Sequence, residues 1–307
     1  MCCNRGMSLG ELCDLLERHG RPDLTTAIDG VRICKADQTV SPGASMSGTV
    51  LALVAQGTKR LALGDHVYEY GAGQYLIASV DLPVTGQFID ADPGRPALGF
   101  AMTLEPAVIA ELLLQTGPEQ VPQSRSSARP GIAVSDATEE LLDAIVRLLR
   151  LLDHPRDRDA LAPLIKREIL WRLLTGEQGD AVRQLGLADS SLHHITRAVR
   201  WIRENYARQF RIEEVAQLSG MSVSAFHRNF QVVTGMTPIQ FQKHIRLQTA
   251  RLILANRPSD VTGVGHAVGY DSPSQFSREY RRLFGEPPSR DAVRMRDEAG
   301  VAVAALP

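Results

Sequence analysis

Residues 220–235 read GMSVSAFHRNFQVVTG, and residues 269–285 read GYDSPSQFSREYRRLFG. The two stretches share one pattern, because a serine, an aromatic residue, an arginine, a second aromatic residue and a glycine recur fifty positions later. Repetition of this kind indicates one supersecondary unit used twice. The matching pairs are Ser224 and Ser274, Phe226 and Phe276, Arg228 and Arg278, Phe230 and Tyr280, and Gly235 and Gly285.

Each copy predicts two helices joined by a tight turn. The first helix is short, at 212–218 in one copy and at 261–268 in the other. Gly220 and Gly269 follow these helices, and glycine is the residue that a turn with positive φ favours. The layout is that of a helix-turn-helix, whose second helix enters the major groove of DNA.

The second helix of each copy has clear start signals and two distinct faces. Ser222 and Ser272 are expected to cap these helices, and Pro273 suits the first helical position. The two aromatic residues of each copy lie four positions apart, so they share the inner face of the helix. The polar residues left on the outward face are Ser224, His227 and Arg228 in the first copy and Ser274, Ser277 and Arg278 in the second.

A long helix is predicted between the copies, from Thr237 and Pro238 to about Ala255. Such a helix spans roughly 25 Å at a rise of about 1.5 Å per residue. Together with the width of the flanking units, this length predicts recognition helices about 34 Å apart, which is one turn of DNA. One chain would then read two successive segments of the major groove.

Charge divides the chain into an acidic and a basic part. Residues 193–296 hold 16 Lys and Arg and 8 Asp and Glu (16 − 8 = +8), whereas residues 1–192 hold 18 and 25 (18 − 25 = −7). This asymmetry favours a basic module that faces a polyanion, with a solvated basic surface as the alternative. We predict an α+β chain with a sensor and dimerisation domain at 1–175, a linker at 176–192, a DNA-binding domain at 193–296 and a flexible tail at 297–307.

The amino-terminal domain combines short strands with helices. Six segments rich in β-branched and aromatic residues predict strands, which favours a small barrel or sandwich. Ser8 lies three positions before Glu11 and predicts the start of a first helix that ends at Gly20. The predicted strands are 49–56, 59–63, 67–70, 74–80, 84–90 and 97–104, and the later helices are 106–116, 136–152 and 158–174.

The apolar stripes of the last two of these helices are wide enough to pack on a barrel and also on a second copy of the chain. Two interpretations stay open for them. One is a homodimer formed through 136–174, and the other is packing within a single chain.

The cysteines and the hydropathy indicate a reducing compartment. Cys2, Cys3, Cys13 and Cys34 form no C-x-x-C pair, and no apolar run approaches the roughly 18 residues of a membrane span. No signal-peptide pattern is visible. We therefore expect a cytoplasmic protein without a membrane partner. Cys34 is either a thiol sensor or a buried, inert side chain.

With these motifs, residues 193–296 resemble the DNA-binding domain of the AraC/XylS family of transcription regulators. The matching stretches are IEEVAQLSGMSVSAFHRNF, TGMTP with F-x-x-x-x-R-L-x-x-A-R-x-x-L after it, and GYDSPSQFSREYRRLFGEPPS, about a third of the chain. The sequence departs from the family at Gly263 and Gly265, where better helix formers are usual. It also lacks the usual Tyr-Arg pair after Pro288.

The amino-terminal part resembles the cupin-like sensor domain of one branch of this family, through LVAQGTK at 53–59 and through Tyr75 and Leu76. The resemblance implies a cupin-like β-barrel with helices, followed by an all-α domain with two helix-turn-helix units. It also implies a regulator that binds double-stranded DNA by sequence, responds to a small-molecule effector, and contacts RNA polymerase if it activates transcription.

The resemblance assigns DNA contacts to outward-facing residues of both copies. Arginine suits guanine, because its forked donors match two acceptors on the base edge. Hydroxyls near helix caps and further arginines more often bind phosphate, and the arginines have intramolecular pairing as an alternative. The expected base contacts are Ser224, His227, Arg228, Ser274, Ser277 and Arg278, and the expected phosphate contacts are Ser222, Ser272, Arg246, Arg281 and Arg282.

An apolar cavity inside the barrel is the expected effector site, with a filled core as the alternative. The residues predicted to line it are Val50, Ala52, Val54, Tyr75 and Ile77.

Two other functions remain as alternatives. A cupin-type metalloenzyme needs at least three metal ligands, and among the strands only His66 and Glu69 form a candidate pair. No nucleophile elbow, P-loop or dinucleotide motif is present, so we predict no enzyme, no metal and no cofactor. An architectural protein that binds DNA without sequence choice differs from a regulator in the ratio of specific to nonspecific affinity.

Overall fold

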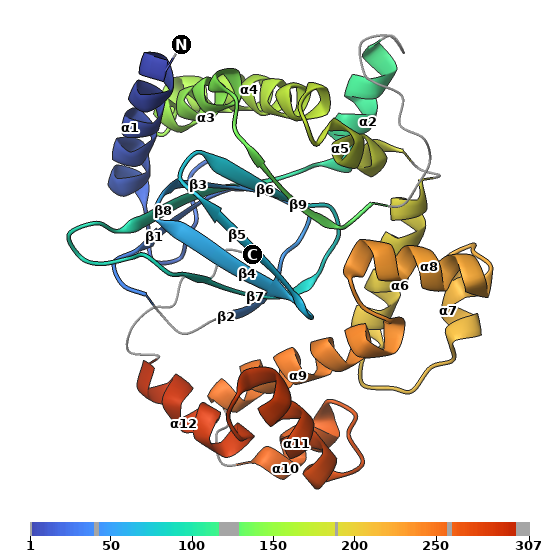
Figure 1. Cartoon of the computed structure of the whole chain (residues 1–307). Coiled ribbons are helices and arrows are strands. Elements are labelled where there is room, and N and C mark those ends of the chain that lie inside the picture. The colour runs from blue at the N-terminus through green and yellow to red at the C-terminus, as the bar shows by residue number, and fades with distance from the viewer. Residues whose placement is uncertain (1, 40–42, 117–128, 188–189, 257–259, 299–307) are drawn as a thin grey trace. The chain divides into compact units, whose positions relative to one another are not determined.

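The computed structural model of the chain describes residues 2–39, 43–116, 129–187, 190–256 and 260–298 (Figure 1). The chain divides into two compact units between His193 and His194. The predicted tail lies outside the described residues from position 299 onward.

Two antiparallel sheets form the centre of the amino-terminal unit (Figure 1). The first sheet has the strand order β1-β8-β3-β6-β9, and the second has the order β2-β7-β4-β5. The strands are β1 (Val31–Ala36), β2 (Gly43–Met46), β3 (Val50–Gln56), β4 (Thr58–Leu63), β5 (His66–Gly71), β6 (Gln74–Ala78), β7 (Pro83–Phe88), β8 (Ala97–Thr103) and β9 (Ile132–Asp136).

Helices cover one face of the five-stranded sheet. Leu51 and Phe100 on this face share a core with Leu16 of the first helix and Ile145 of the third, and all four side chains are fully buried. Figure 1 shows α1, α3 and α4 along this side of the strands. The helices of this unit are α1 (Cys2–His19), α2 (Pro106–Gln115), α3 (Glu139–Arg150), α4 (Pro155–Thr175) and α5 (Gly179–Gly186).

The predicted strands and the mixed fold class are confirmed. All six predicted strands are present as β3 to β8, with ends that differ by at most two residues, whereas β1, β2 and β9 were not predicted. The start of the first helix was predicted wrongly. Because α1 begins at Cys2, Ser8 lies inside the helix and does not cap it.

The linker prediction for 176–192 is wrong over most of its length. α5 occupies residues 179–186, and its Val182 is fully buried in the core of the amino-terminal unit. Gly186 fits closely on α2, since a Cβ at this glycine would lie 2.8 Å from the backbone nitrogen of Ala110. The glycine at 186 therefore allows close packing of α5 on α2 and does not mark a flexible connection.

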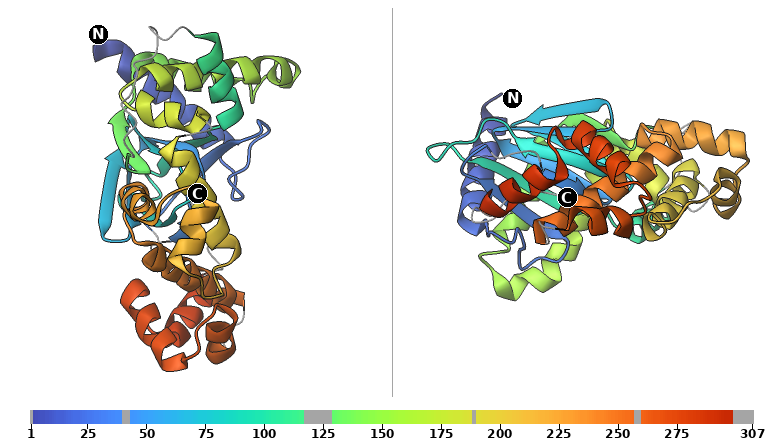
Figure 2. Two further views of the ribbon diagram at one scale, coloured as in Figure 1. Left: turned by 90° about the vertical axis from the view of Figure 1, so that its right-hand side faces the viewer. Right: turned by 90° about the horizontal axis from the view of Figure 1, so that it is seen from below.

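The carboxy-terminal unit is helical, as predicted, and α9 connects its two helix-turn-helix units (Figures 1 and 2). Thr237 and Gln240 start α9 with a reciprocal capping box, because each side chain bonds the backbone nitrogen of the other. The helices are α6 (Ser191–Glu204), α7 (Ile212–Leu218), α8 (Val223–Thr234), α9 (Pro238–Asn256), α10 (Val261–Ala267), α11 (Pro273–Phe284) and α12 (Pro288–Glu298).

Candidate nucleic-acid interface

The first helix-turn-helix consists of α7 and α8. Phe226 and Phe230 of α8 are fully buried, and their ring centroids lie 5.3 Å apart. Phe230 also packs edge-on against Phe241 of α9, at 5.4 Å between centroids. This packing fixes which face of α8 is turned outward, and it leaves Ser224, His227 and Arg228 exposed.

The second helix-turn-helix consists of α10 and α11 and repeats this arrangement. Phe276 and Tyr280 are fully buried in a core that also contains Tyr270 and Val264. Ser274 and Arg278 are exposed, as their counterparts are in α8, whereas Ser277 is half-buried. The structure thus presents a serine and an arginine at equivalent outward positions of both second helices.

The second helices begin and end with the predicted signals. The Oγ atoms of Ser222 and Ser272 accept hydrogen bonds from the backbone nitrogens of Ala225 and Gln275, each at 3.3 Å. Gly235 and Gly285 end these helices in the left-handed conformation.

The hydroxyl groups that cap α8 and α11 differ in their surroundings. Ser272 Oγ also lies 2.9 Å from Ser274 Oγ, so the cap and an expected base contact share a hydrogen bond. Arg281 and Arg282 are exposed in the last turn of α11. The phosphate contacts expected of Ser222, Ser272, Arg281 and Arg282 stay predictions.

Arg246 has a structural role, which favours the intramolecular alternative over the phosphate contact expected of it. Its guanidinium donates to the backbone oxygens of Tyr206 at 2.7 Å and Gly269 at 2.8 Å, and more weakly to those of Ala207 and Arg208. The donors that a phosphate would need are therefore bonded to carbonyls. Arg246 connects the chain before α7 to the turn of the second helix-turn-helix.

The turn before α11 brings two backbone segments into very close contact. Gly269 has a φ of +88°, and a Cβ at this position would lie 2.0 Å from the carbonyl oxygen of Ala207. A side chain therefore has no room there. Gly220, the equivalent residue of the first copy, has a φ of +72° and only side-chain atoms of His194 near its missing Cβ, at 3.7 Å.

Glu279 holds the second recognition helix against α9. Its carboxylate accepts from Lys243 Nζ at 3.0 Å and from the Tyr270 hydroxyl at 2.8 Å. Burial tends to raise the pKa of Glu279, but the hydrogen bonds from Lys243 and Tyr270 outweigh it and hold that pKa below its usual value. Glu279 is thus charged near neutral pH, and its ion pair orients α11.

A second carboxylate, Asp291 of α12, lies fully buried on another side of α11. Its Oδ2 accepts from Arg251 Nε at 2.9 Å and from the Tyr280 hydroxyl at 2.8 Å, and its Oδ1 is paired with Arg294. The guanidinium of Arg251 also lies over the ring of Phe284, at 4.7 Å. This network, which joins α9, α11 and α12, was not predicted. Two of its residues, Asp291 and Arg294, lie in the segment after Pro288, where the sequence departs from the family pattern.

In the amino-terminal unit, the five residues predicted to line one effector cavity lie on two opposite faces of a sheet. Tyr75 and Ile77 pair with Leu53 and Leu51 of β3 and belong to the helix-covered core. Side chains alternate along a strand, so the other face holds Val50, Ala52 and Val54. The prediction of one pocket lined by all five residues is therefore wrong.

The space between the two sheets contains an unusual buried cation, Lys59 of β4. Lys59 is 4% exposed and stands beside Tyr70 of β5 and Phe88 of β7 in the sheet register. Its Nζ lies 5.3 Å from the centroid of the Phe88 ring. Burial lowers the pKa of Lys59 to about 8 and raises the pKa of the nearby Cys34 thiol.

Cys34 is fully buried on β1. Burial and a raised pKa make a thiol less reactive, so the structure favours the inert interpretation of this cysteine. The burial of Lys59 is predictable from the alternation of β4, because Lys59, Leu61 and Leu63 form its inward set.

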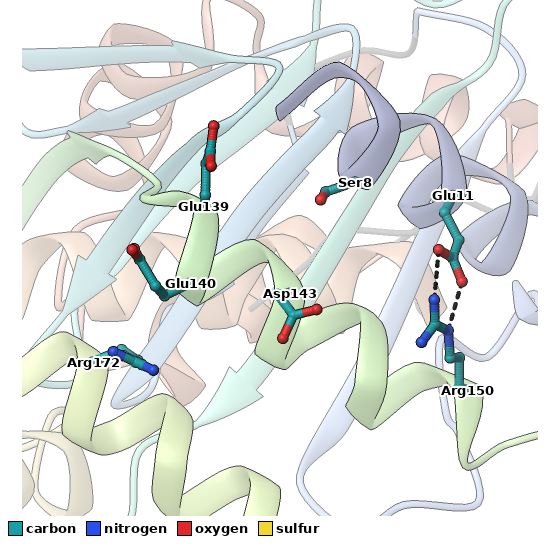
Figure 3. Close-up of a pocket in the computed structure, with 7 residues that line it drawn as sticks. All are labelled: Ser8, Glu11, Glu139, Glu140, Asp143, Arg150 and Arg172. Carbon is teal, nitrogen blue, oxygen red and sulfur yellow. Dashed lines mark hydrogen bonds and ion pairs between the residues drawn. The ribbon is translucent and has the colours of Figure 1, made fainter. Parts of the chain in front are cut away.

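A pocket of about 440 Å³ lies among α1, α3 and α4 (Figure 3). Arg150 forms two hydrogen bonds with Glu11, at 2.6 and 2.7 Å, and this pairing lowers the pKa of Glu11. The charged lining does not match the apolar effector cavity expected from the sequence. The residues that line it are Ser8, Glu11, Glu139, Glu140, Asp143, Arg150 and Arg172.

The pair considered for a metal does not come together with a third ligand. His66 is exposed, and Glu69 is bonded to Arg60 at 2.6 Å. Within the described ranges, no three His, Cys, Asp or Glu side chains are grouped closely enough to hold a metal ion. Likewise, no helix in the described part of the chain has the length and apolar character to cross a bilayer.

A two-sheet unit that is followed in the chain by a duplicated helix-turn-helix defines a class of protein. This class is the DNA-binding transcription regulators with a separate amino-terminal regulatory domain. Residues 215–292 match the family described as "Helix-turn-helix domain". Residues 27–181, about half of the chain, match the family described as "AraC-type transcriptional regulator N-terminus". The chain belongs to the AraC family of transcriptional regulators.

Curated relatives agree with this assignment. The chain is 28% identical to the HTH-type transcriptional regulator ExsA of Pseudomonas aeruginosa over 161 residues, which are 52% of this chain and 57% of ExsA. It is 26% identical to the HTH-type transcriptional activator RhaS of Salmonella paratyphi A over 162 residues, 52% of this chain and 56% of RhaS. The chain thus spans a little over half the length of these relatives.

Solved structures of ToxT from Vibrio cholerae share the fold. An apo variant has a TM-score of 0.55 at 8% identity and covers 88% of this chain and 100% of ToxT. The wild-type protein bound to an unsaturated fatty acid has a TM-score of 0.52 at 8% identity, with 85% and 94% covered.

Proposed function

We propose that this regulator binds DNA by sequence and that a small-molecule effector controls it through the amino-terminal unit. The observation that carries the proposal is the duplicated second helix. Buried aromatic residues fix its orientation in both copies, and the same two residue types are exposed at matching positions, Ser224 and Arg228 in α8 and Ser274 and Arg278 in α11. A single chain then reads two segments of the major groove.

The exposed arginines carry most of the proposed sequence choice. Arg228 and Arg278 suit guanine, because a guanidinium donates two hydrogen bonds to its O6 and N7 atoms. Ser224, Ser274, Ser277 and His227 supply shorter contacts at the same surface. Arg281 and Arg282 lie one turn further along α11 and fit phosphate contacts, which position a protein without specifying sequence.

The proposal is tested by selecting bound fragments from genomic DNA with the purified full-length protein. We expect one sequence class to be enriched and to bind at least about a thousandfold more tightly than unrelated DNA. The comparison must be made at one salt concentration, since both kinds of binding weaken as salt rises. Equal affinity for all fragments would identify an architectural protein instead.

Arg278→Ala and Arg281→Ala are predicted to affect DNA binding in different ways. Loss of Arg278 should weaken binding to the selected operator by about 1–3 kcal/mol and relax base choice at one position. Loss of Arg281 should weaken binding evenly across sequences. It should also reduce the slope of log affinity against log salt concentration by about 1. Affinities measured on a library of single-base operator variants separate the two effects. Unchanged base preference in Arg278→Ala would contradict the assigned contact.

The effector part of the proposal is supported by the amino-terminal unit. This unit matches a regulatory domain of its family, and a ToxT structure of the same fold holds an unsaturated fatty acid. RhaS, a relative of this chain, is named an activator, so contact with RNA polymerase is part of the proposal. A regulator that binds operators works in the cytoplasm, where we place the protein.

We also propose that a homodimer forms through α4. The stripe of α3 is used inside the chain, because its apolar residues are buried in the core. On α4, by contrast, Leu161 and Leu164 remain 42% and 63% exposed. Of the predicted range 136–174, the outward side of α4 is therefore the part that suits a partner copy.

Leu164→Arg is predicted to shift the protein toward monomer, because a charge cannot be buried unpaired in an apolar interface. Sedimentation velocity over a range of protein concentrations measures the change. Leu114→Arg on α2 is the matched control, since Leu114 is 88% exposed but lies on a different helix. A wild-type protein that is monomeric at every concentration would end the dimer proposal.

A further inference from the structure

Lys59 lacks the partner that a buried charge normally has. Among the residues that the structure describes, no carboxylate lies within ion-pair distance of its Nζ. Charged side chains are almost never fully buried unless they are paired. By comparison, Lys35 on β1 pairs with Glu17 at 3.3 Å, and Lys166 on α4 pairs with Glu105 at 2.9 Å.

The groups that face Lys59 do not supply the missing negative charge. Tyr70, beside it in the sheet, is a phenol whose pKa is raised by burial. Cys34 approaches from the opposite sheet, and burial raises its pKa as well, so both groups stay neutral near pH 7. Phe88 contributes only the face of its ring, which is a weak substitute for an anion.

The walls around Lys59 are apolar and in part built of small residues. On the sheet that carries Cys34, the inward set includes Gly99, Ala101 and Ala52, which pair with one another or with Cys34 across the strands. On its own sheet, Lys59 has Gly86 as a neighbour, since a Cβ there would lie 3.5 Å from Lys59 Cε. A ligand that fits these surroundings has an apolar body and a single negative group.

We infer that the space between the two sheets is the effector site and that the effector is a small monocarboxylate whose carboxylate pairs with Lys59. This inference rests on the proposed control by an effector and names the chemical class of that effector. The carboxylate forms the ion pair that the chain itself does not provide. The apolar body contacts the inward face of β3, where Val50, Ala52 and Val54 lie.

The test uses calorimetric titration of the full-length protein at pH 7 with butyrate, hexanoate and octanoate. The matching alcohols measure what the apolar body contributes alone, and sodium chloride at the same ionic strength measures the response to an inorganic anion. We expect at least one acid to bind and its alcohol to bind far more weakly. If no acid binds, or if acid and alcohol bind equally, the inference is wrong.

Lys59→Met removes the charge but keeps an unbranched side chain. We expect the affinity for the bound acid to fall roughly ten- to a hundredfold, as for the loss of one buried charged hydrogen bond, while the affinity for the alcohol stays the same. Lys35→Met is the matched control, because it removes a lysine of the same unit that already has a carboxylate partner. Full affinity for the acid in Lys59→Met would overturn the assignment.

The wild-type protein offers a second measurement that needs no variant. Because the pKa of Lys59 in the free protein is about 8, the ammonium that pairs with the acid is lost above that pH. Carboxylic acids stay ionised there, since their pKa is about 4 to 5, and Tyr70 and Cys34 stay neutral until higher pH. The affinity should thus be level from pH 6 to 7.5 and fall by up to about tenfold per pH unit above 8. A level profile up to pH 9.5 contradicts the ion pair.

These readouts do not depend on DNA, so the two proposals fail separately. A protein that selects an operator but binds none of the acids refutes the effector class alone. A protein that binds an acid through Lys59 but shows no sequence choice refutes the proposed regulation by sequence and leaves the ligand site standing.

Discussion

Replacement of Gly269 by alanine is expected to destabilise the carboxy-terminal unit by roughly 3–5 kcal/mol, from left-handed strain and overpacking together. The left-handed conformation alone costs a non-glycine residue about 1–2 kcal/mol. The larger part comes from the added Cβ, which would lie 2.0 Å from the carbonyl oxygen of Ala207. Backbone must move to relieve this contact, and the moving segment is the one that Arg246 binds.

Gly285→Ala is the matched control for this prediction. Gly285 has a φ of +82°, close to the +88° of Gly269, but nothing lies within 4 Å of its missing Cβ. Gly285→Ala should therefore lower the free energy of unfolding only by the cost of the left-handed conformation, about 1–2 kcal/mol. Urea unfolding followed by Trp201 fluorescence in a Trp171→Phe background reports on the carboxy-terminal unit. Equal losses for the two variants would show that the close approach at Ala207 is not important.

Asp291→Ala is the second change for which we expect a large effect. It removes the carboxylate that Arg251 and Tyr280 share and leaves the guanidinium of Arg251, 11% exposed, without that carboxylate. Removal of one partner from a buried ion pair typically costs about 3–5 kcal/mol. The loss should also weaken operator binding through the second helix-turn-helix, because α11 and α12 are joined by this residue.

Two further variants separate the charge from the packing around Asp291. Tyr280→Phe removes a single hydrogen bond and should cost about 1–3 kcal/mol. The double variant Arg251→Met with Asp291→Leu replaces the two most buried charges by apolar side chains and leaves the more exposed Arg294 in place, so it should be milder than Asp291→Ala. The same urea unfolding measures all three. If Asp291→Ala costs less than about 1 kcal/mol, the network does not stabilise the second unit.

The duplicated helix-turn-helix was predictable because its signals are local. Ser222 and Ser272 cap their helices three positions before the nitrogens that they bind, and the glycines stand at the turns. The four-residue spacing of the aromatic pairs fixed which residues point outward, so the exposure of Arg228 and Arg278 followed from helical periodicity. Packing partners elsewhere in the chain were not needed for these inferences.

Three strands of the amino-terminal unit were missed because their pairing is not local. β1 alternates poorly, since Arg32 and Lys35 interrupt its apolar residues. β2 consists of Gly43–Met46 and has almost no apolar pattern. β9 follows α2 by more than ten residues yet pairs with β6, so its identity as a strand depends on a distant partner. The same dependence explains the error in the effector pocket, because the face of β6 could not be matched to that of β3.

The roles of single charged residues were also hidden in long-range contacts. Arg246 binds Tyr206, forty positions earlier in the chain, and Arg251 binds Asp291, forty positions later. A basic residue on a helix gives no sign of which partner it will meet. Lys59 differs, because the inward direction of its side chain can be predicted from the alternation along β4 once the strand is recognised.

The bonds that Arg246 makes have a consequence for the operator. The guanidinium of Arg246 joins the carbonyls at 206–208 to that of Gly269. The two helix-turn-helix units therefore do not rotate independently of each other. Each base pair inserted between two recognised segments turns one against the other by about 35°. Operators of this regulator should therefore have a fixed internal spacing that tolerates neither insertions nor deletions, and a search of promoter regions can use that constant interval as its strictest criterion.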